Sequence, residues 1–334
     1  MSADCYHHDQ QYRRSSKRLI CLARLIILVF TAHIQTAIAM EGQGPEILPE
    51  NYAESVMIGM ISEDGSREIS LRLARFPEKN SAHIWLHFTD GKEAWSLVDE
   101  NFILNHQTAT PVAADRVVFD ASKDTQQLSF QASQRNSGRL LGLVTGNLTA
   151  SATRFPRAGE GDIATSLNLT FAATGTGFRS NSGRWEMTGT VQGDITLDGR
   201  SYHIEGPGKW HEQTGPRARF APAFTYLNLQ NEKISLLAIG INKRTVGYAI
   251  IDGVMLGVAD LQVAPEGPDE RQFSLNLLPA NGEPELLDGT LQVTQRWSVP
   301  IEGTDRPGST VVVNTAYGVL SGSLNDWKPA GDPR

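Results

Sequence analysis

Apolar and polar residues alternate along most of this chain, and this alternation constrains its fold most strongly. From Ser55 onward the apolar residues recur at every second position in short runs. That period places them on one face of a strand, and no window of about 12 residues carries the apolar stripe of an amphipathic helix. The missing helices exclude parallel α/β folds. The sequence therefore predicts an all-β protein.

Tight-turn dipeptides punctuate the predicted strands. Two-residue hairpin turns favour Asp-Gly and Asn-Gly because both residues tolerate positive φ. Six such turns are predicted: Asp64-Gly65, Asp90-Gly91, Asp198-Gly199, Asp252-Gly253, Asn281-Gly282 and Asp288-Gly289. Their even spacing is typical of antiparallel strands closed into barrels or sandwiches.

Two of these turns predict a strand register. A two-residue turn at Asp198-Gly199 pairs Ile195 with Tyr202 and Asp194 with His203. The same rule at Asp90-Gly91 pairs Leu86 with Trp95. We expect the second strand of the Asp198-Gly199 hairpin to break at 206–208, Gly-Pro-Gly, because proline removes a ladder donor and glycine permits a bend.

The first 39 residues resemble a secretory leader. Basic residues from Arg13 to Arg18 precede the apolar run from Leu25 to Ala32, and Ala37-Ile38-Ala39 supplies a small-x-small cleavage pattern. Arg24 keeps the apolar run well below the roughly 20 residues of a spanning helix, so no integral membrane segment is expected in the mature chain. The predicted location is periplasmic or secreted.

Charge and cysteine content exclude several classes of partner. The chain has 30 Lys and Arg against 37 Asp and Glu, and the leader removes five basic and two acidic residues, which leaves 25 against 35. A net charge of minus 10 disfavours nucleic acid and anionic membranes. Both cysteines, Cys5 and Cys21, lie in the leader, so the mature chain has no thiol for a disulfide or a metal.

The mature chain is long enough for two domains. The segment from Thr174 to Gly183 is rich in Gly, Ser and Asn and is the best candidate linker. We therefore predict a leader at 1–39, an N-terminal β domain at 40–178 and a C-terminal β domain at 179–334. Each half has the size of a small lipocalin-like barrel.

The stretch from Gly183 to Arg217 resembles a known family. Its pattern W-E-x-x-G-x-V-x-G-x-I-x-L-D-G, followed by G-x-G and G-P-R, is similar to the AttH-like group that includes the carotenoid 1,2-hydratases, also called hydroxyneurosporene synthases. Related proteins include prenyl-isoflavonoid hydratases, lipocalin-like cyclases and lipid carriers. The resemblance covers about the middle 35 residues and implies two packed lipocalin-like domains around a hydrophobic ligand such as an isoprenoid.

The same resemblance points to a candidate site. Family members usually continue with x-x-Asp-His-x-Trp-Gly, in which the acidic residue is the expected proton donor. Aligning Gly215 places His211 at that aspartate, Glu212 at the histidine and Thr214 at the tryptophan, so this chain departs from the pattern. In an extended strand His211 and Glu212 point to opposite faces, so only one of them is expected to face a cavity.

Protonation of an alkene needs an acid in a dry pocket and aromatic faces that stabilise the cation. Glu212 or His211 is the candidate general acid. The candidate substrate-binding residues are Trp210, Arg217, Phe220, Phe224, Tyr226 and Tyr248. The alternative is a structural ion pair between Glu212 and Arg217, with His211 a structural residue and the aromatic side chains part of an ordinary core.

Two further features leave alternatives open. His83 and His87 share a strand face with Trp85 but lie about 13 Å apart, too far for a local zinc site, so they face solvent or the edge of a pocket. Residues 244–251 and 254–261 are apolar on both faces, which fits a cavity wall, a domain interface or plain burial in a sandwich.

Three functions remain from the sequence alone. The first is a cofactor-free and metal-free hydratase, isomerase or cyclase acting on a hydrophobic small molecule. The second is a carrier that binds such a molecule, and the third is a structural module of the envelope. No nucleophile elbow, phosphate loop, dinucleotide fingerprint or zinc-protease helix is present.

Overall fold

A computed structural model describes most of the chain after the predicted leader. The described residues are Leu48, 51–111, 113–155, 160–175, 177–180, 183–216, 223–265, 269–301 and 304–327. Residues 42–334 form one compact unit. Almost all of its regular structure is antiparallel strand, as predicted, with two short 3₁₀ turns, η1 (Pro77–Lys79) and η2 (Arg135–Ser137).

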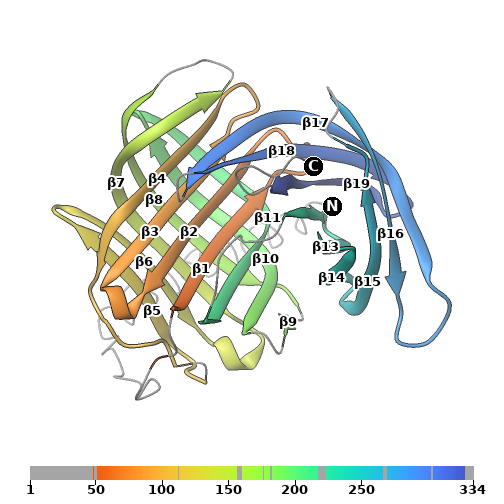
Figure 1. The fold of residues 1–334 in the computed structure, drawn as a ribbon, viewed down its shortest axis with the longest axis horizontal. Helices are drawn as coiled ribbons and strands as arrows, with labels where there is room; N and C mark the ends of the chain where they lie inside the picture. The colour runs from red at the N-terminus through yellow and green to blue at the C-terminus, as the bar shows by residue number, and fades with distance from the viewer. Residues whose placement is uncertain are drawn as a thin grey trace, which may run out of the picture. The chain divides into compact units, whose positions relative to one another are not determined.

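The first sheet contains the strands up to Pro216 (Figure 1). Their bounds are β1 (Tyr52–Ile61), β2 (Glu68–Phe76), β3 (Ser81–Thr89), β4 (Ala94–Leu104), β5 (Val117–Lys123), β6 (Gln126–Ser133), β7 (Leu141–Phe155), β8 (Glu160–Ala173), β9 (Phe178–Arg179), β10 (Arg184–Leu197) and β11 (Arg200–Pro216). Strand β11 pairs with both β1 and β10, and β4 pairs with β7, so the hydrogen bonds run around a ring.

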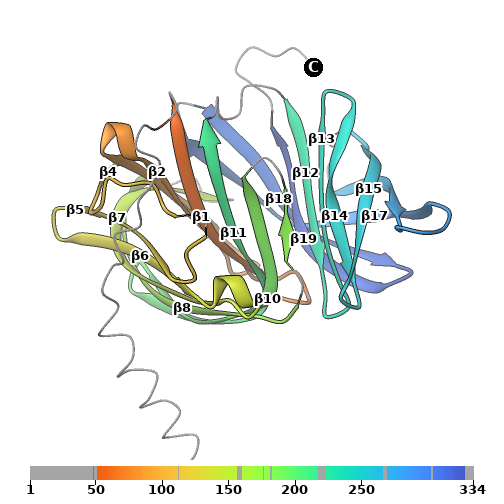
Figure 2. The same ribbon diagram turned by 90° about the horizontal axis from the view of Figure 1, so that it is seen from below.

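The second sheet is a closed barrel of eight strands, β12 to β19 (Figure 2). Their bounds are β12 (Phe224–Gln230), β13 (Ile234–Ile241), β14 (Arg244–Ile251), β15 (Val254–Val263), β16 (Glu270–Leu278), β17 (Glu285–Ile301), β18 (Thr304–Thr315) and β19 (Gly318–Trp327). The two sheets agree with the predicted pair of lipocalin-like β domains.

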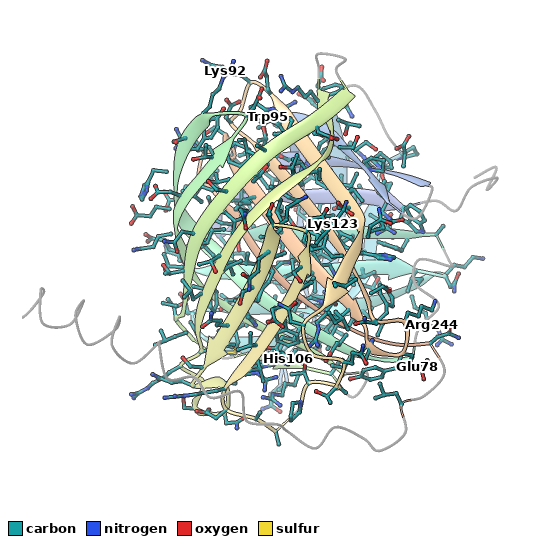
Figure 3. The ribbon with its side chains drawn as sticks, turned by 90° about the vertical axis from the view of Figure 1, so that its left-hand side faces the viewer. Glu78, Lys92, Trp95, His106, Lys123 and Arg244 are labelled. Atoms are coloured by element: carbon teal, nitrogen blue, oxygen red, sulfur yellow. The ribbon has the colours of Figure 1, made fainter. Side chains whose placement is uncertain are left out.

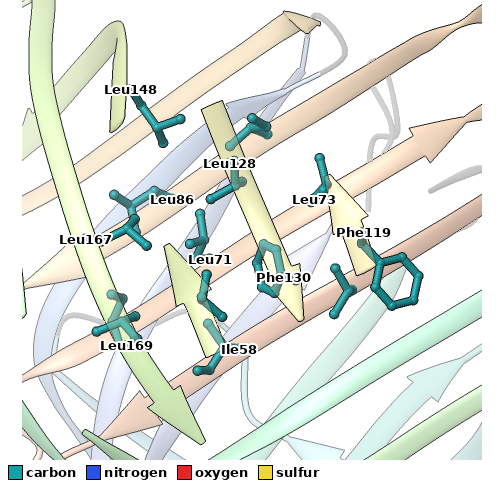
Figure 4. Close-up of a cluster of buried hydrophobic side chains, with 14 of the residues drawn as sticks. Ile58, Leu71, Leu73, Leu86, Phe119, Leu128, Phe130, Leu148, Leu167 and Leu169 are labelled. Carbon is teal, nitrogen blue, oxygen red and sulfur yellow. The ribbon is translucent and has the colours of Figure 1, made fainter. Parts of the chain in front are cut away.

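Each sheet has its own apolar core. In the first, alternate residues of every strand except β9 turn inward, and the large side chains shown in Figure 4 have almost no exposed surface. Phe130 of β6 and Ile58 of β1 both belong to this cluster. In the second, Leu236, Leu275 and Val311 belong to a separate cluster. Period-two alternation therefore builds two cores because each sheet curves around its own apolar face.

The inner face of the first sheet also contains an ion pair, because Asp99 shares its face with Leu97 on β4 and Lys123 shares its face with Ala121 on β5. Figure 3 views this sheet from the side where β4 to β7 lie and labels Lys123 at the end of β5. The ammonium of Lys123 lies 2.5 Å from Asp99 Oδ2. Lys123 is partly exposed, and pairs of this kind contribute at most about 1 kcal/mol to folding.

The hairpin at Asp198-Gly199 matches its prediction in every pair. Ile195 faces Tyr202 and Asp194 faces His203. Both turn residues have positive φ, 52° and 75°, as a type I′ turn requires. The Asp252-Gly253 turn also joins its strands through two residues. These two hairpin predictions are confirmed.

Other turn predictions were wrong. At Asp90-Gly91 the loop has four residues, because Asp90 Oδ1 accepts hydrogen bonds from the backbone N–H groups of Lys92 and Glu93, and Trp95 faces Phe88 instead of Leu86. Asp64-Gly65 and Asn281-Gly282 lie in longer loops. Asp288-Gly289 lies inside β17, where Gly289 faces Phe273.

Strand β11 does not break at residues 206–208. It pairs with β10 without a register shift from Arg200 to Gln213. Gly208 faces Gly189, and a Cβ on Gly208 would lie 2.4 Å from the carbonyl oxygen of Gly59 on β1. The glycine therefore permits close packing of three strands rather than a bend.

The change of sheet does not coincide with the predicted boundary at 178/179. Strands β10 and β11 follow that boundary but pair with β8 and β1 of the first sheet. The second sheet begins at Phe224. The linker-like segment from Thr174 to Gly183 is instead a connection within the first sheet, which contains the short strand β9.

Candidate functional site

Strand β11 presents different side chains to its two faces. Its register with β1 places Trp210 opposite Ile58 and Glu212 opposite Val56, residues of the first core. Lys209 and His211 alternate with them and point to the other face. This confirms that His211 and Glu212 do not face the same space.

The outer face of β11 borders a cavity of about 470 Å³. Its wall comes from strands of both sheets, namely β1, β2, β3, β10 and β11 of the first and β12, β13, β17, β18 and β19 of the second. Aromatic side chains supply much of the wall: Trp85, Phe224, Tyr226, Trp297 and Trp327. A concave, largely apolar space with a few polar groups is typical of small-molecule sites.

Glu212 lies away from this cavity, in the core of the first sheet. Arg135 of η2 donates from Nε to Glu212 Oε1 over 3.2 Å and from a terminal nitrogen to Oε2. The indole of Trp210 donates to Glu212 Oε1 over 3.0 Å. Glu212 therefore forms an ion pair with Arg135, while its predicted partner Arg217 lies outside the described residues. A carboxylate held on both oxygens is a strong structural pair.

His211 lines the cavity, and a hydrogen bond to Glu186 of β10, which is itself paired with Arg184, fixes its ring. Its Nδ1 lies 2.9 Å from Glu186 Oε1, which also accepts from Arg184 at 2.6 Å. Burial, and then the charge of Arg184, lowers the pKa of His211 to about 3. Burial alone would raise the pKa of Glu186, but Arg184 and His211 hold it well below its usual range. His211 is therefore a neutral imidazole oriented by a carboxylate.

Glu68, the first residue of β2, is a second ionisable group in the wall. Its two oxygens accept hydrogen bonds of 2.5 Å from Thr310 and Ser323 on the second barrel. Burial raises the pKa of Glu68 to about 7 in spite of these hydroxyl donors. A carboxyl with this pKa exchanges a proton near neutral pH.

His87 stands next to Glu68. Its Nε2 lies 3.9 Å from Glu68 Oε2, and its ring contacts that of Trp297 at a tilt of 31°, with 4.0 Å between centroids. Within the described residues neither ring nitrogen has a hydrogen-bond partner, although the side chain is buried. Burial lowers the pKa of His87 to about 3. The predicted pocket-edge position of His87 is confirmed.

The predicted site residues are divided by the structure. His211, Phe224 and Tyr226 line the cavity. Trp210 and Glu212 lie in the first core. Tyr248 is buried behind the wall, where its ring stacks on Phe178 and burial, followed by the charge of Glu186, raises its pKa well above the usual range. The predictions for Arg217 and Phe220 fall outside the described residues.

Sequence reasoning missed Glu68, Lys209 and Arg184. Glu68 had no motif around it, and its position at the end of a predicted strand gave no sign of burial. Lys209 and Arg184 offered one weak signal, since both lie within the stretch 183–217 and share a strand face with His211 or with its partner Glu186. That stretch gave no sign that Lys209 and Arg184 line a cavity together with residues of the second barrel.

The strands at 244–251 and 254–263 do not line the cavity. Val246 is 52% exposed, but Tyr248 and Ile250 on the same face of β14 are buried and cluster with Phe178 of the first sheet, as in the predicted domain interface. Ala249, on the opposite face, belongs to the second core. Among the described residues no cluster of His, Cys, Asp or Glu is arranged to hold a metal ion. The same residues include no helix with the length and hydropathy to cross a membrane.

Comparison with known proteins identifies the fold. No family model matches the chain, and no curated protein matches it in sequence. Its structure is similar to that of CghA, with a TM-score of 0.61 and 13% identity over 85% of this chain and 90% of that one. The structure of CghA with Sch210972 gives a TM-score of 0.60, also at 13% identity, over 86% of this chain and 93% of that one. A putative AttH from Nitrosomonas europaea gives a TM-score of 0.48 at 11% identity, over 87% of this chain and 100% of that one.

The likeness to CghA agrees with the lipocalin-like fold expected from the resemblance of residues 183–217. The chain spans nearly the full length of CghA, so both sheets have counterparts there. At 13% identity the likeness concerns the arrangement of strands.

Proposed function

We propose that this protein, which shares its fold with CghA, is a cofactor-free hydratase, isomerase or cyclase that acts on a hydrophobic small molecule such as an isoprenoid. One observation carries the proposal. The aromatic cavity between the sheets contains Glu68, whose pKa lies near neutral, and neutral imidazoles that can accept a proton.

Glu68 is the proposed proton donor. An alkene is protonated at carbon only by an acid that is still protonated in an apolar site, and burial gives Glu68 that property. The hydroxyls of Thr310 and Ser323 then stabilise the carboxylate that remains. Glu212, the acid expected from the sequence, lies in the first core and is ion-paired, so we do not assign it this role.

Aromatic side chains are the proposed stabilisers of the cation. Protonation of an alkene carbon leaves a positive charge on its neighbour, and Trp297 lines the same cavity. Trp85 and Trp327 line it too, but Arg72 and Arg306 already lie over their rings. Aromatic faces attract cations by about 0.5–2 kcal/mol each, more strongly when water is excluded. Phe224 and Tyr226 complete this wall.

His211 is the proposed base. The Nδ1–H of His211 donates a hydrogen bond to Glu186, so Nε2 is the nitrogen that accepts a proton. In hydration the cation bonds to the oxygen of water, and water loses a proton to Nε2. In isomerisation or cyclisation the proton comes from carbon instead. In each case the proton gained by His211 balances the one lost by Glu68, and exchange with solvent restores both groups.

A carrier that only retains the ligand is the second candidate. The observation in its favour is that Trp297, His87 and Glu68 already pack against one another, as in a binding wall with no chemistry. Both candidates need the cavity, and only the enzyme needs the proton transfers.

The test begins with native mass spectrometry of the protein from its own host. A co-purifying apolar compound is expected, and incubation in deuterium oxide should place carbon-bound deuterium on it. Glu68→Gln and His211→Ala should abolish this exchange but retain the compound. Glu205→Gln, an exposed substitution on the same strand β11, is the matched control and should exchange normally.

Two outcomes would count against the enzyme. If all variants retain the compound and the wild type places no deuterium on it, the carrier is favoured. If gentle extraction recovers no apolar compound and added isoprenoids do not bind, both cavity proposals fail.

We also propose that the protein works in the periplasm or is secreted, because residues 1–39 have the form of a cleaved leader. The intact mass of protein isolated from its host should correspond to a chain that begins at Met40. Recovery of the full-length chain from the cytoplasm would contradict this.

A further inference from the structure

The cavity wall contains a buried cation that is bound to neutral groups. Lys209 is 6% exposed, and its Nζ donates over 2.5 Å to the hydroxyl of Tyr226 and over 2.9 Å to Asn228 Oδ1. An ammonium has three N–H donors, so two acceptors leave one unused. Both acceptors are uncharged. A buried charge without a paired opposite charge is costly unless something else compensates it.

The charges around the cavity favour a negative ligand. Among its described lining residues, Lys209, Arg72, Arg184 and Arg306 are cationic, and Glu68 is the carboxyl. Glu186, behind the wall, compensates Arg184. Glu68 compensates little, since burial raises its pKa to about 7 and it is partly neutral at neutral pH. Among the described residues, the hydrogen-bond partners of Lys209 are both neutral.

A second observation gives the same sign. The charges of Arg184 and Arg72, acting after burial, both help to lower the pKa of His211, although the carboxylate of Glu186 opposes them. Arg184 and Arg72 therefore both add positive charge to the wall that contains His211. A neutral hydrocarbon would fill the apolar part of the cavity but leave this charge uncompensated.

The hydroxyl of Tyr226 adds a directed donor. Its oxygen accepts from Lys209, so its own O–H is free to donate, and its ring lines the cavity. An ammonium N–H and a phenol O–H on one side of a cavity can bind the two oxygens of a carboxylate. The aromatic walls of Trp297 and Trp327 would then hold the apolar body.

We propose that the ligand of this cavity is an amphipathic monoanion, a long apolar body with one carboxylate-type head group bound by Lys209 and Tyr226. The proposal deepens the proposed function by naming the class of molecule, and it rests on the same cavity. It does not depend on proton transfer. One negative charge is favoured over two because Glu68 faces the same cavity and interacts with Lys209.

The test compares simple probes that differ only in the head group. Dodecanoate, dodecan-1-ol and dodecyl phosphate are titrated at about pH 8, where the carboxylic acid is ionised, and binding is followed by tryptophan fluorescence and calorimetry. Dodecanoate should bind at least about tenfold more tightly than dodecan-1-ol, because hydrogen bonds to charged groups contribute about 1.5–3 kcal/mol. Dodecyl phosphate should bind no more tightly than dodecanoate.

Variants assign the preference to the named residues. Lys209→Met should reduce the preference for dodecanoate to less than about threefold, because the side chain keeps its length but loses its charge. Tyr226→Phe should weaken dodecanoate binding alone, and it keeps the buried cation if Lys209→Met fails to fold. Lys233→Met, which changes an exposed lysine of the second barrel, is the matched control and should retain the full preference.

The outcomes separate this proposal from the proposed function. Equal binding of dodecanoate and dodecan-1-ol by the wild type would overturn the anion proposal and leave the cavity intact. Tighter binding of dodecyl phosphate would also overturn it, in favour of a dianion. A preserved carboxylate preference without any deuterium exchange would support it and count against the enzyme alone. If no probe binds, both fail.

Discussion

The two faces of strand β11 contain equally buried charged residues with different surroundings. On the inner face, Glu212 is 5% exposed, and Arg135 holds both of its oxygens. On the outer face, Lys209 and His211 are 6% and 2% exposed, but they border open space and neutral or shifted partners. Burial alone therefore does not distinguish a structural charge from a functional one.

Partner geometry makes the distinction. The inner pair has no space for another molecule beside it, and its oxygens are bound by Arg135 and Trp210. The outer residues keep unused donors or acceptors, and the pKa values of His211, His87 and Glu68 are shifted toward neutral forms. Shifted groups in a cavity are candidates for function, and matched ion pairs in a core are candidates for stability.

Breaking the inner pair should have the largest effect. Glu212→Gln leaves the guanidinium of Arg135 buried without a counter-ion, so the free energy of unfolding should fall by about 3–5 kcal/mol in urea denaturation. The double variant Glu212→Leu with Arg135→Met removes both charges and should recover most of this loss. A loss below about 1 kcal/mol in Glu212→Gln would show that the inner face is not the structural one.

The outer face should make the protein sensitive to acid. His87 and His211 have pKa values of about 3 in the folded state, against an ordinary 6.5. In this pH range both imidazoles are protonated in the unfolded state but stay neutral in the folded state. The free energy of unfolding therefore falls as pH drops from 6.5 toward 3. Between pH 6.5 and 4.5 each imidazole should cost roughly 2 kcal/mol.

Glu68 acts in the opposite direction. Its folded pKa of about 7 lies above the ordinary 4.5, so the folded state holds an extra proton in this window and gains stability as pH falls from 7 to 4.5. Urea midpoints at about pH 6.5 and 4.5 test both signs. His87→Gln should reduce the acid sensitivity, and Glu68→Gln should increase it. Unchanged pH dependence in His87→Gln would contradict the assignment.

Packing on the inner face gives a third, smaller effect. A Cβ on Gly142 would lie 2.5 Å from Cζ3 of Trp210, so Gly142→Ala should destabilise the protein by about 1–3 kcal/mol and shift the tryptophan fluorescence. Gly175→Ala is the control, because no heavy atom lies within 4 Å of its added Cβ. Equal free energies of unfolding for the two variants would mean that Trp210 and its neighbours shift to accommodate the added methyl group at little cost.

The smallest effect concerns the hydroxyls that hold Glu68. Ser323→Ala removes a donor that favours the charged carboxylate, so the pKa of Glu68 should rise further. Stability at low pH, where Glu68 is protonated in both proteins, should change by less than about 1 kcal/mol. Infrared titration of the carboxyl band follows the pKa directly. A fall in the pKa would show that Ser323 does not act on this group.

Local features of the fold could be predicted from the sequence, and the cavity could not. The alternation along β11 and the register at Asp198-Gly199 follow from neighbouring residues, and both are confirmed. The Asp90-Gly91 hairpin failed because one side-chain oxygen, Asp90 Oδ1, stabilised a longer loop. Local patterns predict pairs across a turn well only where the turn residues have no competing hydrogen bonds.

The site residues that were missed depend on distant parts of the chain. Thr310 and Ser323 are 242 and 255 positions from Glu68, and Arg135 is 77 positions from Glu212. No window of sequence contains both partners. The resemblance of residues 183–217 directed attention to the correct strand, and only the packing of the second barrel against it shows which of its faces borders the cavity.

The closure of the first ring by β11 has a consequence during synthesis. Strand β1 emerges early from the ribosome, but its partner β11 ends only at Pro216. Until then β1 presents unpaired backbone groups, as β8 does until β10 is complete at Leu197, and an open edge of this kind recruits other chains into aggregates. A fragment ending at residue 178 would lack β10 and β11, so β1 and β8 would stay unpaired at their outer edges. A fragment that extends through Pro216 would pair both edges and close the ring.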